Sequence, residues 1–145
     1  MEVRIKKVRA DAKLPAYGTA YSAGADLCAC LREGLTIAPG ETVLVPTGLS
    51  AAIPAGYAGL IFARSGLASK RGLAPANKVG VIDADYRGEI MVSLHNHSAA
   101  PQTVAPFERV AQMVIVPFLK AEFTETDALD ETERGEGGFG STGRI

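Results

Sequence analysis

Short apolar segments of strand length recur along the chain, and turn-forming residues separate them. The clearest of these segments are residues 43–45, 59–62, 90–94 and 110–116. Proline and glycine punctuate the sequence, as at residues 38–40, 45–48 and 53–56. Closely spaced short strands with such turns are typical of an all-β sandwich or barrel.

One short helix is predicted at residues 66–71. Ser65 has the side chain of a good N-cap, and Gly72 stands where a helix often ends in the left-handed conformation. Such a helix would be shorter than two turns.

The C-terminal part of the chain differs from the rest. Residues 120–134 become acidic and lose the β pattern, which predicts an extended linker. We therefore expect a core domain at residues 1–119, followed by a linker and arm at residues 120–145. The arm is rich in glycine, with five glycines in the ten residues 134–143.

A glycine-rich arm has two interpretations. It can be a flexible terminus, or it can cradle a phosphate with its backbone N–H groups. In the second case Arg134, Ser141 and Thr142 would supply further donors, and Phe139 could stack on a base. The arm is not a Walker loop, because Gly140 precedes Ser141 where that motif has lysine. A single aromatic residue among the glycines favours the phosphate cradle.

Composition and charge restrict the classes of partner. With 145 residues, 15 basic and 16 acidic side chains and a net charge of −1, the chain has the size of one domain and lacks a global positive field for nucleic acid or membranes. Its apolar runs are too short for a signal peptide or a bilayer span. Cys28 and Cys30 are too few and too close for a disulfide framework. We expect a reduced, cytoplasmic protein with a local phosphate site.

Two carboxylates at residues 83 and 85 are candidates for a hydrolytic base. Hydrolysis of a phosphoanhydride needs a group that takes a proton from water, and cations or N–H groups that stabilise the phosphates. Asp83 and Asp85 would point to the same face of an extended strand, so their chemistry alone does not distinguish them. Each could equally be a turn former.

Five short motifs follow one another along the chain. They are residues 22–27 (Ser-Ala-Gly-Ala-Asp-Leu), 63–70 (Ala-Arg-Ser-Gly-Leu-Ala-Ser-Lys), 80–89 (Gly-Val-Ile-Asp-Ala-Asp-Tyr-Arg-Gly-Glu), 108–113 (Glu-Arg-Val-Ala-Gln-Met) and the glycine-rich arm. In this order they resemble the motifs of the homotrimeric dUTPase family. The resemblance covers nearly the whole chain. Phe107 stands where the family usually has glycine, and Ala63 where proline is common. Both departures concern turn geometry rather than a reacting group.

The resemblance implies a fold and an activity. The fold is a distorted jelly-roll β-barrel with one short helix and an extended glycine-rich C-terminal arm. The activity is hydrolysis of dUTP to dUMP and pyrophosphate with Mg²⁺, which limits uracil in DNA and supplies dUMP for thymidylate synthesis. The assembly is a homotrimer. Each of its sites uses the second and fourth motifs of one subunit, the Asp83 hairpin of another and the arm of a third.

The resemblance also assigns individual roles. Asp83 is the base that activates water, Tyr86 packs against the deoxyribose and excludes a 2′-hydroxyl, and Asn77 reads the uracil edge. Asp26 and Arg109 support the site, and Mg²⁺ is held mainly by substrate phosphates and water, with Asp26 and Gln112 able to reach it through water. The other substrate-binding residues are Arg64, Ser65, Gly66, Gly80, Val81, Met91, Gln112, Arg134, Phe139, Gly140, Ser141 and Thr142.

Residue types alone allow plainer explanations. Tyr86 could be a cross-strand packing residue, Asn77 a turn former, and Arg109 and Gln112 part of a solvent-facing strand. His95 and His97 have no neighbours at zinc-ligand spacing, and we expect them at the surface or the edge of the core.

Two other functions compete with dUTP hydrolysis. A dCTP deaminase of related fold would need a catalytic glutamate, whereas residues 91–96 supply none and place Ser93 near that position. A non-catalytic nucleotide-binding trimer would bind without turnover. The presence of Asp83, Tyr86, Arg64 and Gln112 together argues against it.

Overall fold

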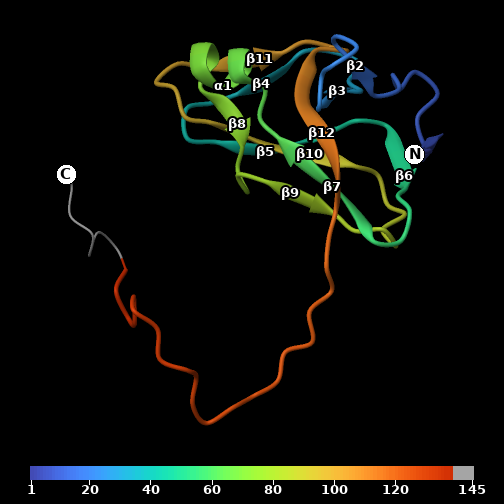
Figure 1. The fold of residues 1–145 in the computed structure, drawn as a ribbon. Coiled ribbons are helices and arrows are strands. Elements are labelled where there is room, and N and C mark those ends of the chain that lie inside the picture. Colours follow the sequence, from blue (N-terminus) through green and yellow to red (C-terminus); the bar gives the residue numbers. More distant parts are fainter. Residues whose placement is uncertain (139–145) are drawn as a thin grey trace.

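Residues 1–138, the part of the chain that the computed structural model describes, fold into short strands with one helix (Figure 1). The apolar segments at 43–45, 59–62, 90–94 and 110–116 each fall mostly within a strand, as predicted. In chain order the elements are β1 (Arg4–Lys7), β2 (Ala16–Tyr17), β3 (Ala25–Cys28), β4 (Leu35–Ile37), β5 (Thr42–Pro46), β6 (Leu49–Ala52), β7 (Tyr57–Phe62), α1 (Ser65–Arg71), β8 (Leu73–Pro75), β9 (Gly80–Ile82), β10 (Met91–Asn96), β11 (Gln102–Val104) and β12 (Arg109–Pro117).

The strands form small antiparallel sheets. The largest has the order β2-β3-β12-β7-β9, and a second has the order β5-β10-β8. Two further pairs, β1-β6 and β11-β4, complete the arrangement of the described residues. Hydrogen bonds do not close these sheets into a continuous barrel, which agrees with the expected distorted form of a jelly roll with one short helix.

The core is built from buried residues of strands β3 to β8 and β10 to β12 and of helix α1. In β10 buried and half-buried residues alternate, with Val92, Leu94 and Asn96 inside. Asn96 is fully buried, but its amide donates to Ile37 O and to Ala100 O at 2.9 Å each, so its polarity is satisfied. Each buried leucine stabilises the fold by about 2 kcal/mol through removal of apolar surface from water. This packing fixes the outer face of β10, which carries Met91 and Ser93.

Helix α1 begins one residue earlier than predicted. Arg64, not Ser65, is the N-cap residue, and no side chain caps the helix. The prediction of Ser65 as N-cap was wrong because Arg64 is the last residue with extended backbone and its carbonyl already accepts from Ala68 N at 2.9 Å. Gly72 ends the helix with φ of 68°, as predicted.

Phe107 adopts a positive φ of 61° although it is not glycine. Its amide donates to Ala29 O at 2.9 Å, and the ammonium of Lys13 lies 4.7 Å from the centre of its ring. For a residue with a Cβ, the left-handed conformation costs about 1–2 kcal/mol relative to the right-handed one. The departure at this position therefore does concern turn geometry.

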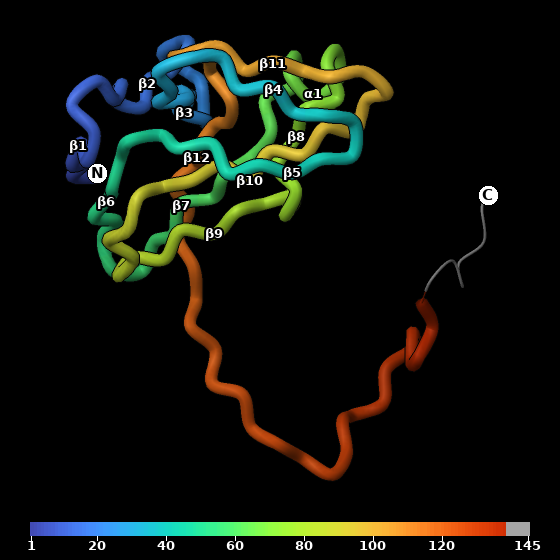
Figure 2. The backbone as a smooth tube through the Cα atoms, turned by 180° about the vertical axis from the view of Figure 1, so that it is seen from behind, coloured from blue at the N-terminus to red at the C-terminus, as the bar shows by residue number. Residues whose placement is uncertain are grey.

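Beyond β12 the chain leaves the core. Residues 118–138 contain no helix or strand and extend away from the sheets (Figures 1 and 2). Leu119, Phe123 and Leu129 are 97%, 95% and 84% exposed. Among residues 1–138, no helix has the length and apolar character needed to cross a membrane. The predicted site residues Phe139, Gly140, Ser141 and Thr142 lie outside the described part of the chain.

Candidate active site

Most of the predicted site residues line two surface hollows. One, of about 370 Å³, is called here the polar hollow and is lined by Gly18, Ser22, Ala23, Gly24, Asp26, Arg64, Ser65, Arg109 and Gln112. The other, of about 190 Å³, is called the hairpin hollow and is lined by Leu44, Ile61, Pro75, Asn77, Gly80, Val81, Ile82, Met91, Val92 and Ser93. None of the residues that line the first also lines the second.

Asp26 joins two arginines in the polar hollow. Its Oδ1 accepts from Arg64 Nε at 2.7 Å, and its Oδ2 accepts from Arg109 Nη1 at 3.1 Å. The Asp26 side chain is only 14% exposed. Strand β12 pairs with both β3 and β7, which brings residue 26, residue 109 and the end of β7 together. One carboxylate between two guanidinium groups leaves a positive charge that suits an anionic ligand.

Gln112 lies beside Asp26 in the same sheet. The two residues are direct partners across the β12–β3 ladder, and Gln112 Nε2 donates to Ala63 O at 2.9 Å. A Cβ at residue 24 would lie 2.3 Å from Gln112 Oε1. Gly24 therefore provides the room that Gln112 occupies. This role of Gly24 could not be predicted from the sequence, because only the fold shows the close approach.

The hairpin hollow lies between β9 and β10, which follow one another in the chain but belong to different sheets. Its walls are mostly apolar, and Asn77 adds an exposed amide beside Gly80. Lys78 has a positive φ of 64°, and Val79 N donates to Asn77 O at 2.7 Å, so a tight turn holds Asn77. An apolar slot with a few polar groups at its edge suits a flat ring with hydrogen-bonding edges.

Asp83 and Asp85 lie in a turn rather than in a strand. Strand β9 ends at Ile82, so the strand face that the two carboxylates would have shared does not exist. Both residues are exposed, and Tyr86 N donates to Asp83 O at 3.2 Å. Tyr86 is 43% exposed and lies next to these carboxylates. The three residues line neither hollow of their own chain.

Two further predicted site residues of the described chain are Gly66 and Arg134. Gly66 has open space around its Cα, beside Ser65 at the start of α1. Arg134 lies on the arm, where its Nε donates to Gly137 O at 2.8 Å. Neither Gly66 nor Arg134 lines one of the two hollows.

Other candidate ligands and nucleophiles lie outside both hollows. Among residues 1–138, no group of three or more His, Cys, Asp or Glu side chains could hold a metal ion. The rings of His95 and His97 pack 4.3 Å apart, and desolvation together with His95 lowers the pKa of His97. Cys28 and Cys30 are free thiols, and burial raises the pKa of each, so both stay protonated at neutral pH.

Known proteins are similar to this chain in sequence and in fold. The family model described as dUTPase matches residues 10–143. A deoxyuridine 5′-triphosphate nucleotidohydrolase of Desulfitobacterium hafniense is 55% identical over 146 residues, covering 99% of this chain and 97% of the relative.

Two solved structures are similar as well. A mutant dUTPase of Staphylococcus bacteriophage 80alpha, solved with dUpNHpp, has a TM-score of 0.84 and 27% identity over 98% of each chain. A mutant dUTPase of S. aureus phage phi11, described with a structural Mg(II) ion, has a TM-score of 0.81. It is 23% identical, covering 90% of this chain and 100% of the other, and shows likeness of fold.

Proposed function

The chain belongs to the dUTPase family, and we propose that it hydrolyses dUTP to dUMP and pyrophosphate. The observation that carries this proposal is the polar hollow, where Arg64 and Arg109 share the single carboxylate of Asp26. The reaction would limit uracil in DNA and supply dUMP for thymidylate synthesis.

The polar hollow is the proposed triphosphate site. The Arg64 guanidinium donates through Nε to Asp26 and through Nη1 to Arg109 O at 3.4 Å, which leaves its Nη2 N–H groups to meet phosphate oxygens. The Ser65 hydroxyl caps no helix and is free to donate to the same group. Gly66 lets the triphosphate approach the backbone closely. Gln112 lies next to Asp26 and adds a polar side chain.

The hairpin hollow is the proposed nucleoside site. The Asn77 amide and the backbone groups of Gly80, Val81 and Met91 would pair with the uracil edge, as a complementary base does. The ring of Tyr86 would pack against the deoxyribose and leave no space for a 2′-hydroxyl. The complex of the bacteriophage 80alpha enzyme with dUpNHpp, a dUTP analogue, supports this class of ligand.

Mg²⁺ is the proposed cofactor. Both carboxylate oxygens of Asp26 already accept from arginines, so Asp26 and Gln112 would reach the ion through water while substrate phosphates hold it directly. A bound Mg²⁺ would neutralise charge on the triphosphate. The structural Mg(II) of the phage phi11 enzyme is a property of that protein, and its likeness to this chain concerns the fold.

Asp83 is the proposed base. It would take a proton from water as the water oxygen bonds to the α-phosphorus and the bond from this phosphorus to the bridging oxygen breaks. The products would be dUMP and pyrophosphate. Asp83 is exposed on the turn after β9, where a phosphate site of another subunit can face it. Asp85, two residues further along the turn, would support the turn.

The complete site is proposed to need three chains. The two hollows have no lining residue in common, and none of residues 118–138 lines either of them. We infer a homotrimer in which the hairpin hollow of one subunit faces the polar hollow of a second. The arm of a third, with Arg134 and residues 139–142, would close over the triphosphate. Residues 1–119 would be the core domain and residues 120–145 the linker and arm.

The hairpin hollow also bears on the dCTP deaminase alternative. Ser93 lines it, and no Asp or Glu of residues 1–138 does. A deaminase would need a carboxylate against the base, so this lining favours hydrolysis at the phosphates. The third alternative, a nucleotide-binding trimer without turnover, is distinguished by assay.

A substrate panel tests the proposed function. We expect pyrophosphate release from dUTP in the presence of Mg²⁺, with rates for UTP, dCTP and dTTP at least about a hundredfold lower, because the hairpin and Tyr86 select base and sugar together. Chelation of Mg²⁺ with EDTA should strongly reduce the dUTP rate. Ammonia release from dCTP would show a deaminase, and tight binding of dUTP without turnover would show a binding protein.

Replacing Gly24 with alanine should weaken the triphosphate site. The new Cβ would lie 2.3 Å from Gln112 Oε1, so Gln112 must move and lose its bond to Ala63 O. We expect kcat/KM for dUTP to fall about tenfold with little change in melting temperature. Gly34→Ala is the control, since it crowds only the Thr103 methyl group at 3.1 Å, away from the hollow. Equal losses in both variants would contradict the role of Gly24.

A further inference from the structure

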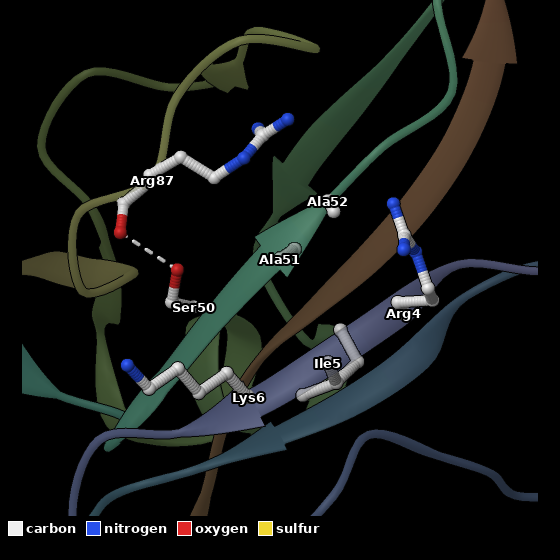
Figure 3. Close-up of a pocket in the computed structure, with 7 residues that line it drawn as sticks. All are labelled: Arg4, Ile5, Lys6, Ser50, Ala51, Ala52 and Arg87. Atoms are coloured by element: carbon white, nitrogen blue, oxygen red, sulfur yellow. Dashed lines mark hydrogen bonds between the residues drawn. The ribbon is translucent and has the colours of Figure 1, made fainter.

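Hydrogen bonds hold the turn at residues 83–89 against strand β6, outside both hollows. The hydroxyl of Ser50, a residue only 5% exposed, donates to Arg87 O at 2.7 Å (Figure 3). Close by, Ile90 N donates to Leu49 O at 2.7 Å, and the buried Thr47 hydroxyl donates to Ile90 O at 2.7 Å. These bonds hold residues 87–90 against residues 47–50.

Glu89 adds a second fastening through its carboxylate. Oε1 accepts from Gly48 N at 2.8 Å and from Arg9 Nε at 3.0 Å, and Oε2 accepts from Arg9 Nη2 at 3.3 Å. Two-point contact with a guanidinium fixes direction as well as distance. Residue 89 is therefore held through its own side chain and through the backbone of the next residue. We call Arg9, Gly48, Ser50 and Glu89 the turn clasp.

The clasp determines where the partner of the Tyr86 hydroxyl lies. Tyr86 OH donates to the main-chain oxygen of Glu89 at 3.0 Å. The edge of its ring lies close over residue 88, since a Cβ there would be 2.3 Å from the hydroxyl oxygen. Arg87 reinforces the turn, because its Nη1 donates to Ala84 O at 2.7 Å and to Tyr86 O at 2.9 Å. A shift of residue 89 would therefore shift the tyrosine ring.

We propose that Glu89, held by Arg9 and Gly48, is a positioning residue for Tyr86 and thereby sets how strictly the enzyme rejects a ribose. This inference rests on the proposed function, in which Tyr86 packs against the deoxyribose. The Tyr86 ring excludes the 2′-hydroxyl of a ribose only if the ring does not move when the larger sugar binds. A displacement of about 1 Å is enough to change discrimination at an active site.

The test compares dUTP with UTP in Glu89→Ala. Without the carboxylate, Gly48 N and Arg9 lose their partner and Glu89 O is free to drift. We expect the ratio of kcat/KM for dUTP to that for UTP to fall about tenfold, the effect of a lost charge-assisted hydrogen bond. Glu89→Gln keeps an oxygen acceptor for Gly48 N and should restore most of the ratio.

A matched control separates positioning from general stability. Glu41 Oε2 accepts from Ala38 N at 2.7 Å in another turn, so Glu41→Ala removes a similar carboxylate-to-backbone bond. It should lower the melting temperature, by less than Glu89→Ala because it loses one bond rather than three, and leave the dUTP to UTP ratio unchanged. If the dUTP to UTP ratio fell in both variants, Glu89 would stabilise the fold without positioning Tyr86.

A double-mutant cycle tests whether the clasp acts through the tyrosine hydroxyl. In Tyr86→Phe the bond to Glu89 O is absent, so adding Glu89→Ala should lower the ratio no further. Independent effects that multiply in the double variant would overturn the proposal, as would a Glu89→Ala enzyme with the wild-type ratio.

A second variant serves if Glu89→Ala does not fold. Ser50→Ala removes the neighbouring hydrogen bond to Arg87 O and must shift the dUTP to UTP ratio in the same direction. A wild-type chain without dUTP turnover would instead refute the proposed function itself.

Discussion

Replacing Asp83 with asparagine should lower kcat for dUTP by about a thousandfold. Asparagine has nearly the same shape, but it cannot take the proton of the attacking water. The turn should survive, because Tyr86 N is bonded to the main-chain oxygen of residue 83 and not to its carboxylate. Pyrophosphate release gives kcat, and titration with a non-hydrolysable dUTP analogue should show a Kd within a few fold of wild type.

Asp85→Asn is the matched control for this prediction. Asp85 lies in the same turn and is also exposed, and the substitution makes the same chemical change. We expect it to retain most of the turnover. If Asp85→Asn lost its turnover and Asp83→Asn stayed active, Asp85 and not Asp83 would be the base. Full activity in both variants would remove the base from this turn.

Truncating the chain after Glu133 should lower kcat for dUTP by about a hundredfold while leaving a folded trimer. The arm is proposed to close over the triphosphate, and closure strengthens electrostatic interactions by excluding water. The core should persist, because residues 118–138 form no strand or helix. Size-exclusion chromatography and thermal unfolding check assembly and stability, and steady-state assays check turnover.

The full-length Glu136→Gln variant is the control for the truncation. It alters a charge in the arm but keeps the arm's length and its glycines, so it should retain nearly all activity. A truncated chain that is a fully active trimer would show that the arm has no part in turnover. A truncated chain that no longer assembles would show that the arm acts in subunit contact instead of closure.

The sequence predicts the strands well because each buries apolar residues in a local pattern. Residues 110–116 are recognisable without knowledge of their partners, and they lie within β12. The start of the helix was less predictable. Serine is a good N-cap in general, but the backbone turn at Arg64 decides which residue is the cap. The end of the helix at Gly72 was easier to predict, because a left-handed residue after a helix is most often glycine.

The geometry of the site depends on pairings between distant strands. Asp26 and Arg109 are 83 positions apart and meet only because β12 pairs with β3 in one register. The family resemblance supplied their roles, but not the shared carboxylate. The contacts of Glu89 with Gly48 and Arg9 also span long separations, so a local sequence pattern does not contain them.

The exposed segment after β12 affects the fate of a subunit that has not yet assembled. Leu119, Phe123 and Leu129 are almost wholly exposed on the single chain. Extended segments with accessible apolar side chains are where proteases cut and chaperones bind. In the proposed trimer another subunit would cover part of this segment. Assembly would then also be the step that protects a newly made chain from degradation.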